Sequence, residues 1–158
     1  MKKLIFFFSS LSIFLFASCN LEPSSSNYTP VVTITSFALN GQTSTTYDTL
    51  TVGTVLTLYG YVSGVTNTLD SVRISNDTSY STLTFTDLSS IDTNVLSNSK
   101  TDISKGFFYL HGFNIYSMPF TLVYIPTQVK KDGKITFQVY SNSSYSPLIT
   151  TFPTPSKN

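Results

Sequence analysis

The chain has 158 residues, the length of one ordinary domain, and its 41% hydrophobic content disfavours a disordered chain. Only 11% of the residues are charged and the formal net charge is +1, which argues against a phosphate-binding surface and therefore against a nucleic-acid partner. A single Cys excludes an internal disulfide framework, and a single His excludes most His-based metal sites.

Residues 1–18 have the pattern of a secretory signal peptide. Lys2 and Lys3 form a short basic region, and an apolar run of 14 residues follows from Leu4 to Ala17. A membrane-spanning helix needs about 20 apolar residues, so this run fits the core of a signal peptide instead. Its removal would leave seven basic residues against eight acidic ones, a net side-chain charge of −1.

The only Cys, Cys19, stands directly after this segment and follows two small residues. The sequence Phe16-Ala17-Ser18-Cys19 resembles the lipobox of bacterial lipoproteins, although the family has Leu, Val or Ile where Phe16 stands. The resemblance implies that a diacylglyceryl group is attached to the Cys19 sulfur and that cleavage makes Cys19 the first residue, with an acylated amine. It implies no other cofactor. The alternative is an ordinary signal peptide that leaves Cys19 as a free thiol.

The residue after the Cys gives an expected destination. In Gram-negative lipoproteins an Asp at this position commonly signals retention at the inner membrane, and this chain has Asn20 there. The resemblance therefore implies an outer-membrane location, and it leaves open which face of that membrane carries the protein. Each buried CH₂ contributes about 0.8 kcal/mol, so two or three acyl chains on Cys19 would make a lasting anchor.

Residues 19–30 are predicted to form the acylated Cys and a flexible tether. The segment is polar, rich in Ser, and bracketed by Pro23 and Pro30. From Val31 onward, apolar and polar residues alternate with period two, the pattern of half-buried strands. We expect seven to nine short strands, and the candidate ranges are 31–37, 49–52 as a short edge strand, 54–62, 69–75, 81–86, 107–113, 120–125, 135–140 and 148–152.

The segments between these strands carry turn signals. Asn40-Gly41 predicts a turn, and Asp132-Gly133 within residues 130–134 predicts the tip of a hairpin. Residues 87–105 are polar with isolated apolar residues, a pattern that predicts a long loop containing a helical turn or two.

The expected fold class is all-β. Residues 31–158 should form a two-sheet antiparallel, immunoglobulin-like sandwich of about seven to nine strands. A lipobox, a short tether and one Ser/Thr/Asn-rich sandwich resemble the small envelope lipoproteins of Bacteroidetes. Residues 120–126 and 132–139 resemble the last strands of the immunoglobulin-like domains in that family. The resemblance carries no catalytic residue.

Four tyrosines are candidates for an aromatic binding surface, on which a sugar ring or a partner protein could stack: Tyr59, Tyr61, Tyr109 and Tyr116. The competing interpretation of the aromatic cluster over residues 107–116 is packing in the core. Two segments, Asp48-Thr49-Leu50 and Asp70-Ser71-Val72, resemble O-glycosylation acceptors of secreted Bacteroidetes proteins, with Thr49 and Ser71 as the candidate acceptor residues.

Catalysis is not expected. His111 lies in the predicted strand 107–113, and the sequence supplies neither an orienting partner nor a nucleophile for it. The acidic residues stand mostly beside turns, where capping explains them. Their thin clusters, Asn76-Asp77-Thr78 and Asp87 with Asp92, lack EF-hand spacing, and the alternative is a calcium site assembled from loops. The sequence therefore predicts a lipid-anchored envelope protein with a non-catalytic binding or assembly role. The alternatives are a carbohydrate-binding accessory protein and an adhesin or fimbria-like subunit.

Overall fold

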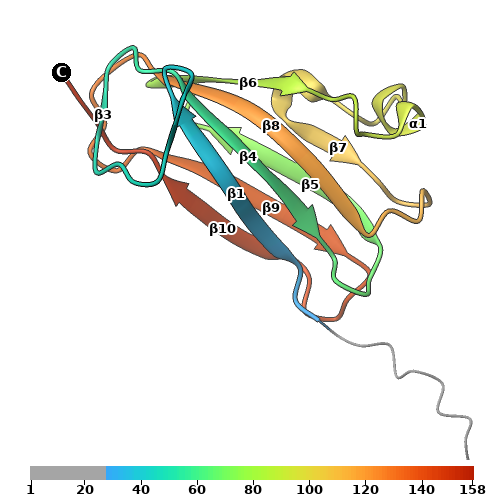
Figure 1. Ribbon diagram of the computed structural model, residues 1–158. Helices are drawn as coiled ribbons and strands as arrows, with labels where there is room; N and C mark the ends of the chain where they lie inside the picture. The colour runs from blue at the N-terminus through green and yellow to red at the C-terminus, as the bar shows by residue number, and fades with distance from the viewer. Residues whose placement is uncertain (1–27) are drawn as a thin grey trace, which may run out of the picture.

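The computed structural model describes residues 28–158, and the predicted signal peptide with Cys19 lies outside this part of the chain (Figure 1). The alternation that begins at Val31 forms strands whose main apolar residues point to one side, and two sheets bury these sides against each other. The sheets are antiparallel and do not close into a barrel, so the predicted all-β sandwich is confirmed.

The five-stranded sheet has the order β2-β1-β4-β8-β6. Its strands are β1 (Val31–Leu39), β2 (Gln42–Ser44), β4 (Leu56–Ser63), β6 (Ser81–Asp87) and β8 (Ser117–Pro126).

The four-stranded sheet has the order β10-β9-β5-β7. It consists of β5 (Leu69–Asn76), β7 (Phe107–Tyr109), β9 (Lys134–Ser141) and β10 (Leu148–Pro153). Two further short strands, β3 (Leu50–Thr51) and β11 (Ser156–Lys157), pair in parallel.

The strand order is that of a constant-type immunoglobulin sandwich, in which strands A, B, E and D form one sheet and C, F and G the other. Strands β1, β4, β8 and β6 occupy the first four places, and β5, β9 and β10 occupy the last three. β7 is an additional edge strand beside β5. The two sheets contain five and four strands, which agrees with the predicted seven to nine.

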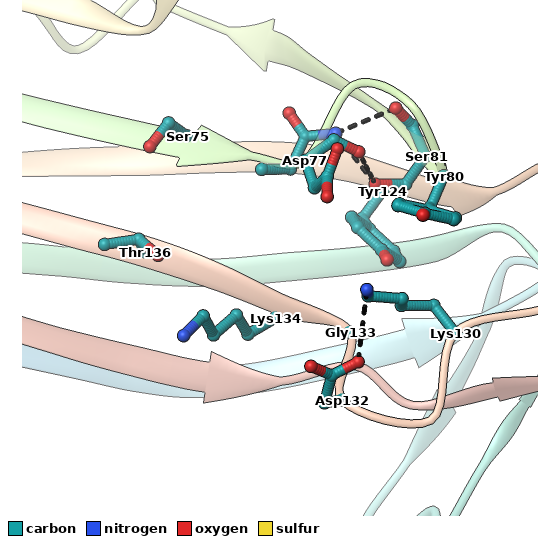
Figure 2. A pocket seen from close by; sticks show the side chains of 11 residues that line it. Ser75, Asp77, Tyr80, Ser81, Tyr124, Lys130, Asp132, Gly133, Lys134 and Thr136 are labelled. Carbon is teal, nitrogen blue, oxygen red and sulfur yellow. Dashed lines mark hydrogen bonds and ion pairs between the residues drawn. The ribbon is translucent and has the colours of Figure 1, made fainter.

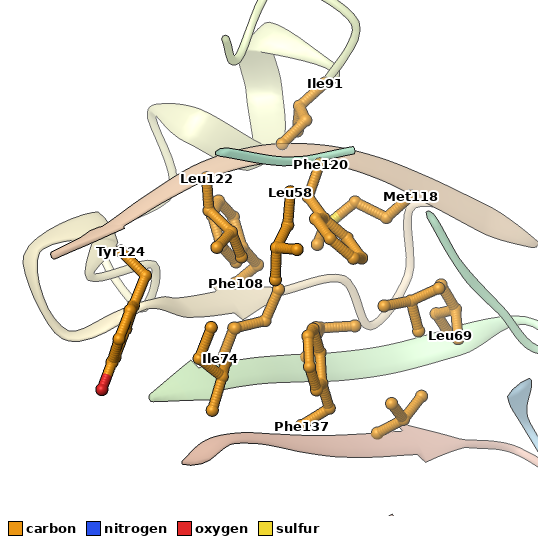
Figure 3. Close-up of a cluster of buried hydrophobic side chains, with 14 of the residues drawn as sticks. Leu58, Leu69, Ile74, Ile91, Phe108, Met118, Phe120, Leu122, Tyr124 and Phe137 are labelled. Atoms are coloured by element: carbon orange, nitrogen blue, oxygen red, sulfur yellow. The ribbon is translucent and has the colours of Figure 1, made fainter. Parts of the chain in front are cut away.

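The core lies between the sheets (Figure 3). On β4 the alternation works as predicted, because Leu56, Leu58 and Val62 are fully buried while Tyr59 and Tyr61 face outward. Aromatic rings from opposite sheets meet in this core. The centroids of Phe120 and Phe137 are 5.5 Å apart, and those of Phe85 and Phe108 are 5.2 Å apart.

The polar stretch between β6 and β7 contains the predicted helical turns, α1 (Thr93–Leu96) and the 3₁₀ helix η1 (Ile103–Lys105). Asp92 caps α1 by accepting a hydrogen bond from the Asn94 amide at 2.8 Å. Val95 is fully buried and joins the core cluster, so the segment packs against the sandwich.

Two local predictions were wrong. The strand expected over residues 107–113 ends at Tyr109, because the Phe113 amide bonds to the Leu110 carbonyl in a turn and Gly112 has a φ of 87°. His111 therefore lies in this turn. The expected hairpin at residues 130–134 is a turn between sheets instead, since β8 already pairs with β4 and β6 while β9 pairs with β5 and β10.

Candidate functional site

The structure does not bring the four predicted tyrosines together on one face. Tyr59 and Tyr61 lie on the outer face of the five-stranded sheet, and Tyr109 lies on the outer face of the four-stranded sheet. Tyr116 lies in the loop that leads into β8, where its carbonyl accepts a hydrogen bond from the Gly64 amide. There are consequently two separate outer surfaces to consider, one on each sheet.

The outer surface around Tyr59 and Tyr61 is aromatic and rich in hydroxyl groups. Tyr59 is 40% exposed and Tyr61 is 37% exposed, and the two residues stand two positions apart on β4. Their cross-strand neighbours on β1 and β8 are small or hydroxyl-bearing side chains, namely Ser36, Thr121, Thr33 and Pro119. This surface offers rings and hydroxyl groups for contact, and the exposed Asp87, next to Thr121 in the same row, adds one acidic charge at its β6 edge.

The outer surface of the four-stranded sheet combines aromatic rings with a cation. In one row, Ser71 on β5 stands between Tyr109 on β7 and Tyr140 on β9. In the next row, Arg73 stands between Phe107 and Gln138, with Ile149 of β10 beyond. We call this surface the basic aromatic face, and define it by Ser71, Arg73, Phe107, Tyr109, Gln138, Tyr140 and Ile149.

A second cation adds to this face at its β7 edge. The Lys100 Nζ lies 4.5 Å from the centroid of the Tyr109 ring and 3.4 Å from its hydroxyl oxygen. A cation over an exposed ring contributes about 0.5–1 kcal/mol, so Lys100 holds the ring in place. His111 follows, with its Nδ1 2.9 Å from Asp70 Oδ1 and its ring centroid 6.2 Å from that of Tyr109. The edge thus carries a Lys and a His beside one tyrosine.

The candidate O-glycosylation residues occupy different environments. Thr49 is half-buried and directly precedes β3. Ser71 is half-buried in the middle of β5, which is paired on both sides, and its neighbours in the row are two tyrosines. Of the two, Thr49 lies in the less regular backbone, and both remain predictions.

A polar cavity of about 290 Å³ lies between the β5–β6 turn and the β8–β9 connection (Figure 2). The Lys130 Nζ lies 4.4 Å from the Tyr80 ring centroid and 3.4 Å from Asp132 Oδ1. The pKa of Asp132 is lowered, chiefly by its own backbone amide and then by Lys130. Asp77 and Lys134 also line the cavity, so its positive and negative charges balance, and it lacks the excess charge that would recognise an ionic ligand.

Within residues 28–158 there is no group of three or more His, Cys, Asp or Glu side chains that could hold a metal ion. The same part of the chain contains no helix long and apolar enough to cross a membrane. The turn-side acids act as caps: Asp77 accepts from the Ser79 amide at 3.0 Å, and Asp87 accepts from the Ser89 hydroxyl at 2.6 Å.

The residues that sequence reasoning missed are Arg73 and Tyr140. The alternation along residues 69–75 predicts that Arg73 points outward, which is confirmed, but the sequence does not tell which residues flank it on β7 and β9. Neither a family model nor a curated protein matches the chain.

Proposed function

We propose that the protein is anchored at the outer membrane by acyl chains on Cys19 and has a non-catalytic binding role in the cell envelope. The anchor is supported by the position of the only Cys at the end of the apolar leader, after Ala17 and Ser18. The binding role is supported by the outer surfaces of the sandwich.

The observation that carries the binding role is the basic aromatic face. Tyr and Arg are the residue types that dominate binding energy at protein interfaces, because they bury a large area and also form polar contacts. Tyr140 and Ile149 are 42% and 58% exposed, and Arg73 is exposed as well. Among residues 28–158 no acidic side chain pairs with Arg73. The face thus suits a partner that carries negative charge and a flat apolar surface.

The anchor is tested on the full-length protein in a bacterial host with a lipoprotein pathway. Mass spectrometry of the mature N-terminus should show Cys19 as the first residue with an added diacylglyceryl mass. Cys19→Ser should move the protein from the membrane fraction to the soluble fraction, and the tether variant Ser24→Ala is the matched control. An unmodified Cys19, or full membrane retention of Cys19→Ser, contradicts the anchor.

The binding role is tested with two tyrosines on opposite sheets, Tyr140 and Tyr59, whose exposed fractions of 42% and 40% are similar. An array of neutral, carboxylated and sulfated glycans, together with cross-linking to envelope proteins, identifies the partner class. Tyr140→Ser and Arg73→Ala should each weaken binding at least tenfold, whereas Tyr59→Ser on the other sheet should not. Equal effects of Tyr140→Ser and Tyr59→Ser on binding would contradict the proposal that the basic aromatic face is the binding surface. Retention by the glycan array would favour the carbohydrate-binding function.

A second candidate function is assembly through strand addition, as in an adhesin or fimbria-like subunit. The observation that favours it lies at the sandwich edge, where β10 pairs only with β9 and β2 covers only the last three residues of β1. A groove of about 470 Å³ runs along this edge, and Ile34, Phe37 and Phe152 contribute its apolar wall. Light scattering over a wide concentration range tests this function, since a strictly monomeric protein contradicts it.

A further inference from the structure

One end of the sandwich is built from four segments. They are the chain entry (residues 28–30) and the connections 64–68, 110–116 and 142–147, and we call them the tether end (Figure 1). Hydrogen bonds tie three of them together, and the pairing of Val31 with Ser63 places the chain entry beside them. The Gly64 amide donates to the Tyr116 carbonyl at 2.9 Å, and the Asn142 amide donates to the Thr68 carbonyl at 3.1 Å. The four segments therefore form one surface of the molecule.

The tether end exposes apolar and aromatic side chains and has almost no charge. Its four segments contain no Lys, Arg, Asp or Glu, and their one His, His111, pairs with Asp70 just outside them. Four side chains in or beside these segments are strongly exposed: Tyr28 at 52%, Val65 at 43%, Tyr116 at 51% and Tyr145 at 61%.

The opposite end of the sandwich is different, because its turns contain charged side chains. They include Asp48, Asp77, Lys130, Lys131 and Asp132. Solvation of charged turns is the ordinary condition of a protein end in water. The contrast between the two ends marks the tether end as the unusual one.

Val65 makes the apolar character of this end more pronounced. Its φ is 63°, in the left-handed region that a β-branched residue rarely adopts. The Ser63 hydroxyl accepts a hydrogen bond from the Val65 amide at 3.0 Å and helps to hold this turn. The fold thus keeps an apolar side chain exposed at the tip of an unfavourable turn, and such outliers are most common at functional positions.

The position of the predicted lipid anchor indicates which surface this end faces. Cys19 stands nine positions before Tyr28, so even a fully extended chain places Tyr28 at most about 30 Å from the acylated residue. The chain enters the sandwich at the tether end, and this end is therefore the part of the domain nearest to the anchor. Tyrosine concentrates at membrane–water interfaces because its ring is apolar and its hydroxyl is polar.

We propose that the tether end rests on the lipid headgroup layer, with Val65, Tyr116 and Tyr145 in contact with the bilayer. This inference rests on the proposed anchor and adds an orientation to it: the domain stands on its end, and both outer sheet faces stay accessible to water. Since the surface has no cationic cluster, the contact depends on apolar burial rather than on anionic lipids or low salt.

The test uses the full-length lipidated protein in phosphatidylcholine vesicles. Val65→Cys and Val129→Cys place a polarity-sensitive fluorophore at opposite ends of the sandwich, and the two valines are equally exposed at 43%. Acylation of Cys19 leaves the introduced thiol as the labelling site. Quenching by aqueous iodide and by a headgroup nitroxide lipid is then measured, and flotation records how much protein stays with the vesicles.

We expect the label at residue 65 to be at least threefold less accessible to iodide than the label at residue 129, and to be quenched by the nitroxide lipid. Protein that floats with the vesicles but shows equal quenching at both positions overturns the resting contact and leaves the anchor intact. Protein that does not float overturns the anchor, and the contact with it.

A second comparison tests the tyrosines. In the labelled Val65→Cys protein, Tyr116→Ser combined with Tyr145→Ser should raise iodide access at least twofold while flotation stays unchanged. Tyr140→Ser, which changes an exposed tyrosine on the outer face of the four-stranded sheet, is the matched control and should have no effect. Unchanged access in the double variant overturns the assignment of these two tyrosines to the bilayer contact.

Discussion

Asp102 is the N-cap residue of the 3₁₀ helix η1. Its Oδ1 accepts from the Ser104 hydroxyl at 2.6 Å and from the Lys105 amide at 3.2 Å, and its Oδ2 lies 2.9 Å from Lys105 Nζ. The Ser104 hydroxyl, followed by Lys105, lowers the pKa of Asp102 to about 2. An unfolded Asp has a pKa of about 3.9. The turn is therefore stabilised by this carboxylate above about pH 4 and loses that contribution as the pH falls toward 2.

The first prediction concerns this pKa. Ser104→Ala removes the strongest hydrogen bond to the carboxylate, so the Asp102 pKa should rise toward its ordinary value. Nuclear magnetic resonance titration of the Asp102 carboxyl carbon measures it. Ser97→Ala, in the preceding helical turn, is the control and should leave the titration unchanged. An unaltered midpoint in Ser104→Ala would contradict the assigned cause.

Tyr47 connects the loop before β3 to the end of β10. Its hydroxyl donates to the Pro153 carbonyl at 2.5 Å, and its ring packs edge-on against Phe37 with centroids 5.3 Å apart. Burial, followed by the nearby Tyr124, raises the pKa of Tyr47 far above its ordinary range. The phenol consequently stays protonated, and its hydrogen bond is kept, throughout neutral and alkaline conditions in which exposed tyrosines ionise.

The second prediction is that Tyr47→Phe lowers the free energy of unfolding by about 1 kcal/mol, the typical contribution of one hydrogen bond when the ring packing is retained. Urea denaturation measures it. Tyr59→Phe removes the hydroxyl of an exposed tyrosine and should change stability by less than about 0.5 kcal/mol. Equal effects of the two substitutions would mean that the bond to Pro153 contributes nothing.

At the scale of elements, two glycines with similar backbone angles have different roles. Gly106 ends η1 with a φ of 63°, its carbonyl accepts from the Ile74 amide at 2.9 Å, and a Cβ there would collide with the Ile74 carbonyl. Gly112 has a φ of 87°, and a Cβ there would meet no atom within 4 Å. The first glycine permits a close approach between segments, whereas the second only permits a turn.

The third prediction follows from this difference. Gly112→Ala should cost about 1–2 kcal/mol, because an L-residue is strained in the left-handed region. Gly106→Ala carries the same strain and adds a steric overlap, so its cost should exceed that of Gly112→Ala by about 1–3 kcal/mol. Urea denaturation of both variants provides the comparison. Similar costs would show that η1 moves away from β5 without penalty.

The strands show what alternation can and cannot predict. β4 could be predicted in position and in orientation, because leucine and valine alternate with threonine and tyrosine along it, with Gly60 as the one inward position that lacks an apolar side chain. The segment at residues 130–134 could be predicted as a turn, but not as a crossing between sheets. Whether a turn joins paired strands depends on which strand edges are already occupied, and this is settled by residues far away in the chain.

At the scale of the whole molecule, the two sheets are held together by ring contacts between them. Phe120 belongs to the five-stranded sheet and Phe137 to the four-stranded sheet, and their rings meet at a tilt of 38°. Both residues are almost fully buried. Phe85 and Phe108 form an edge-on contact of the same kind nearer to β7.

The fourth prediction is an energetic coupling of about 0.5–1.5 kcal/mol between Phe120→Leu and Phe137→Leu in a double-mutant cycle. Phe85→Leu combined with Phe137→Leu is the control, since Phe85 has its ring contact with Phe108 instead, and these changes should be additive within about 0.5 kcal/mol. Additivity in the Phe120–Phe137 cycle would mean that the ring contact does not link the sheets.

The fold class could be predicted from the sequence because most local patterns agree with it, from the turn residues to the period-two strands, and the two local errors do not change the fold class. The candidate surfaces could be predicted only in part. The sequence identifies Tyr109 as a surface candidate, but its row neighbours Ser71 and Tyr140 come from strands more than 30 residues away. Their meeting depends on strand register across the sheet, which no local pattern specifies.

The direction of β1 has a mechanical consequence for a domain held by its N-terminal side. β1 begins at Val31 and runs away from the chain entry, while its hydrogen bonds to β4 lie across the strand direction. A pull from the anchor side against a load at the far end acts along β1, so the whole ladder from Val31 to Leu39 resists in shear instead of opening one bond after another.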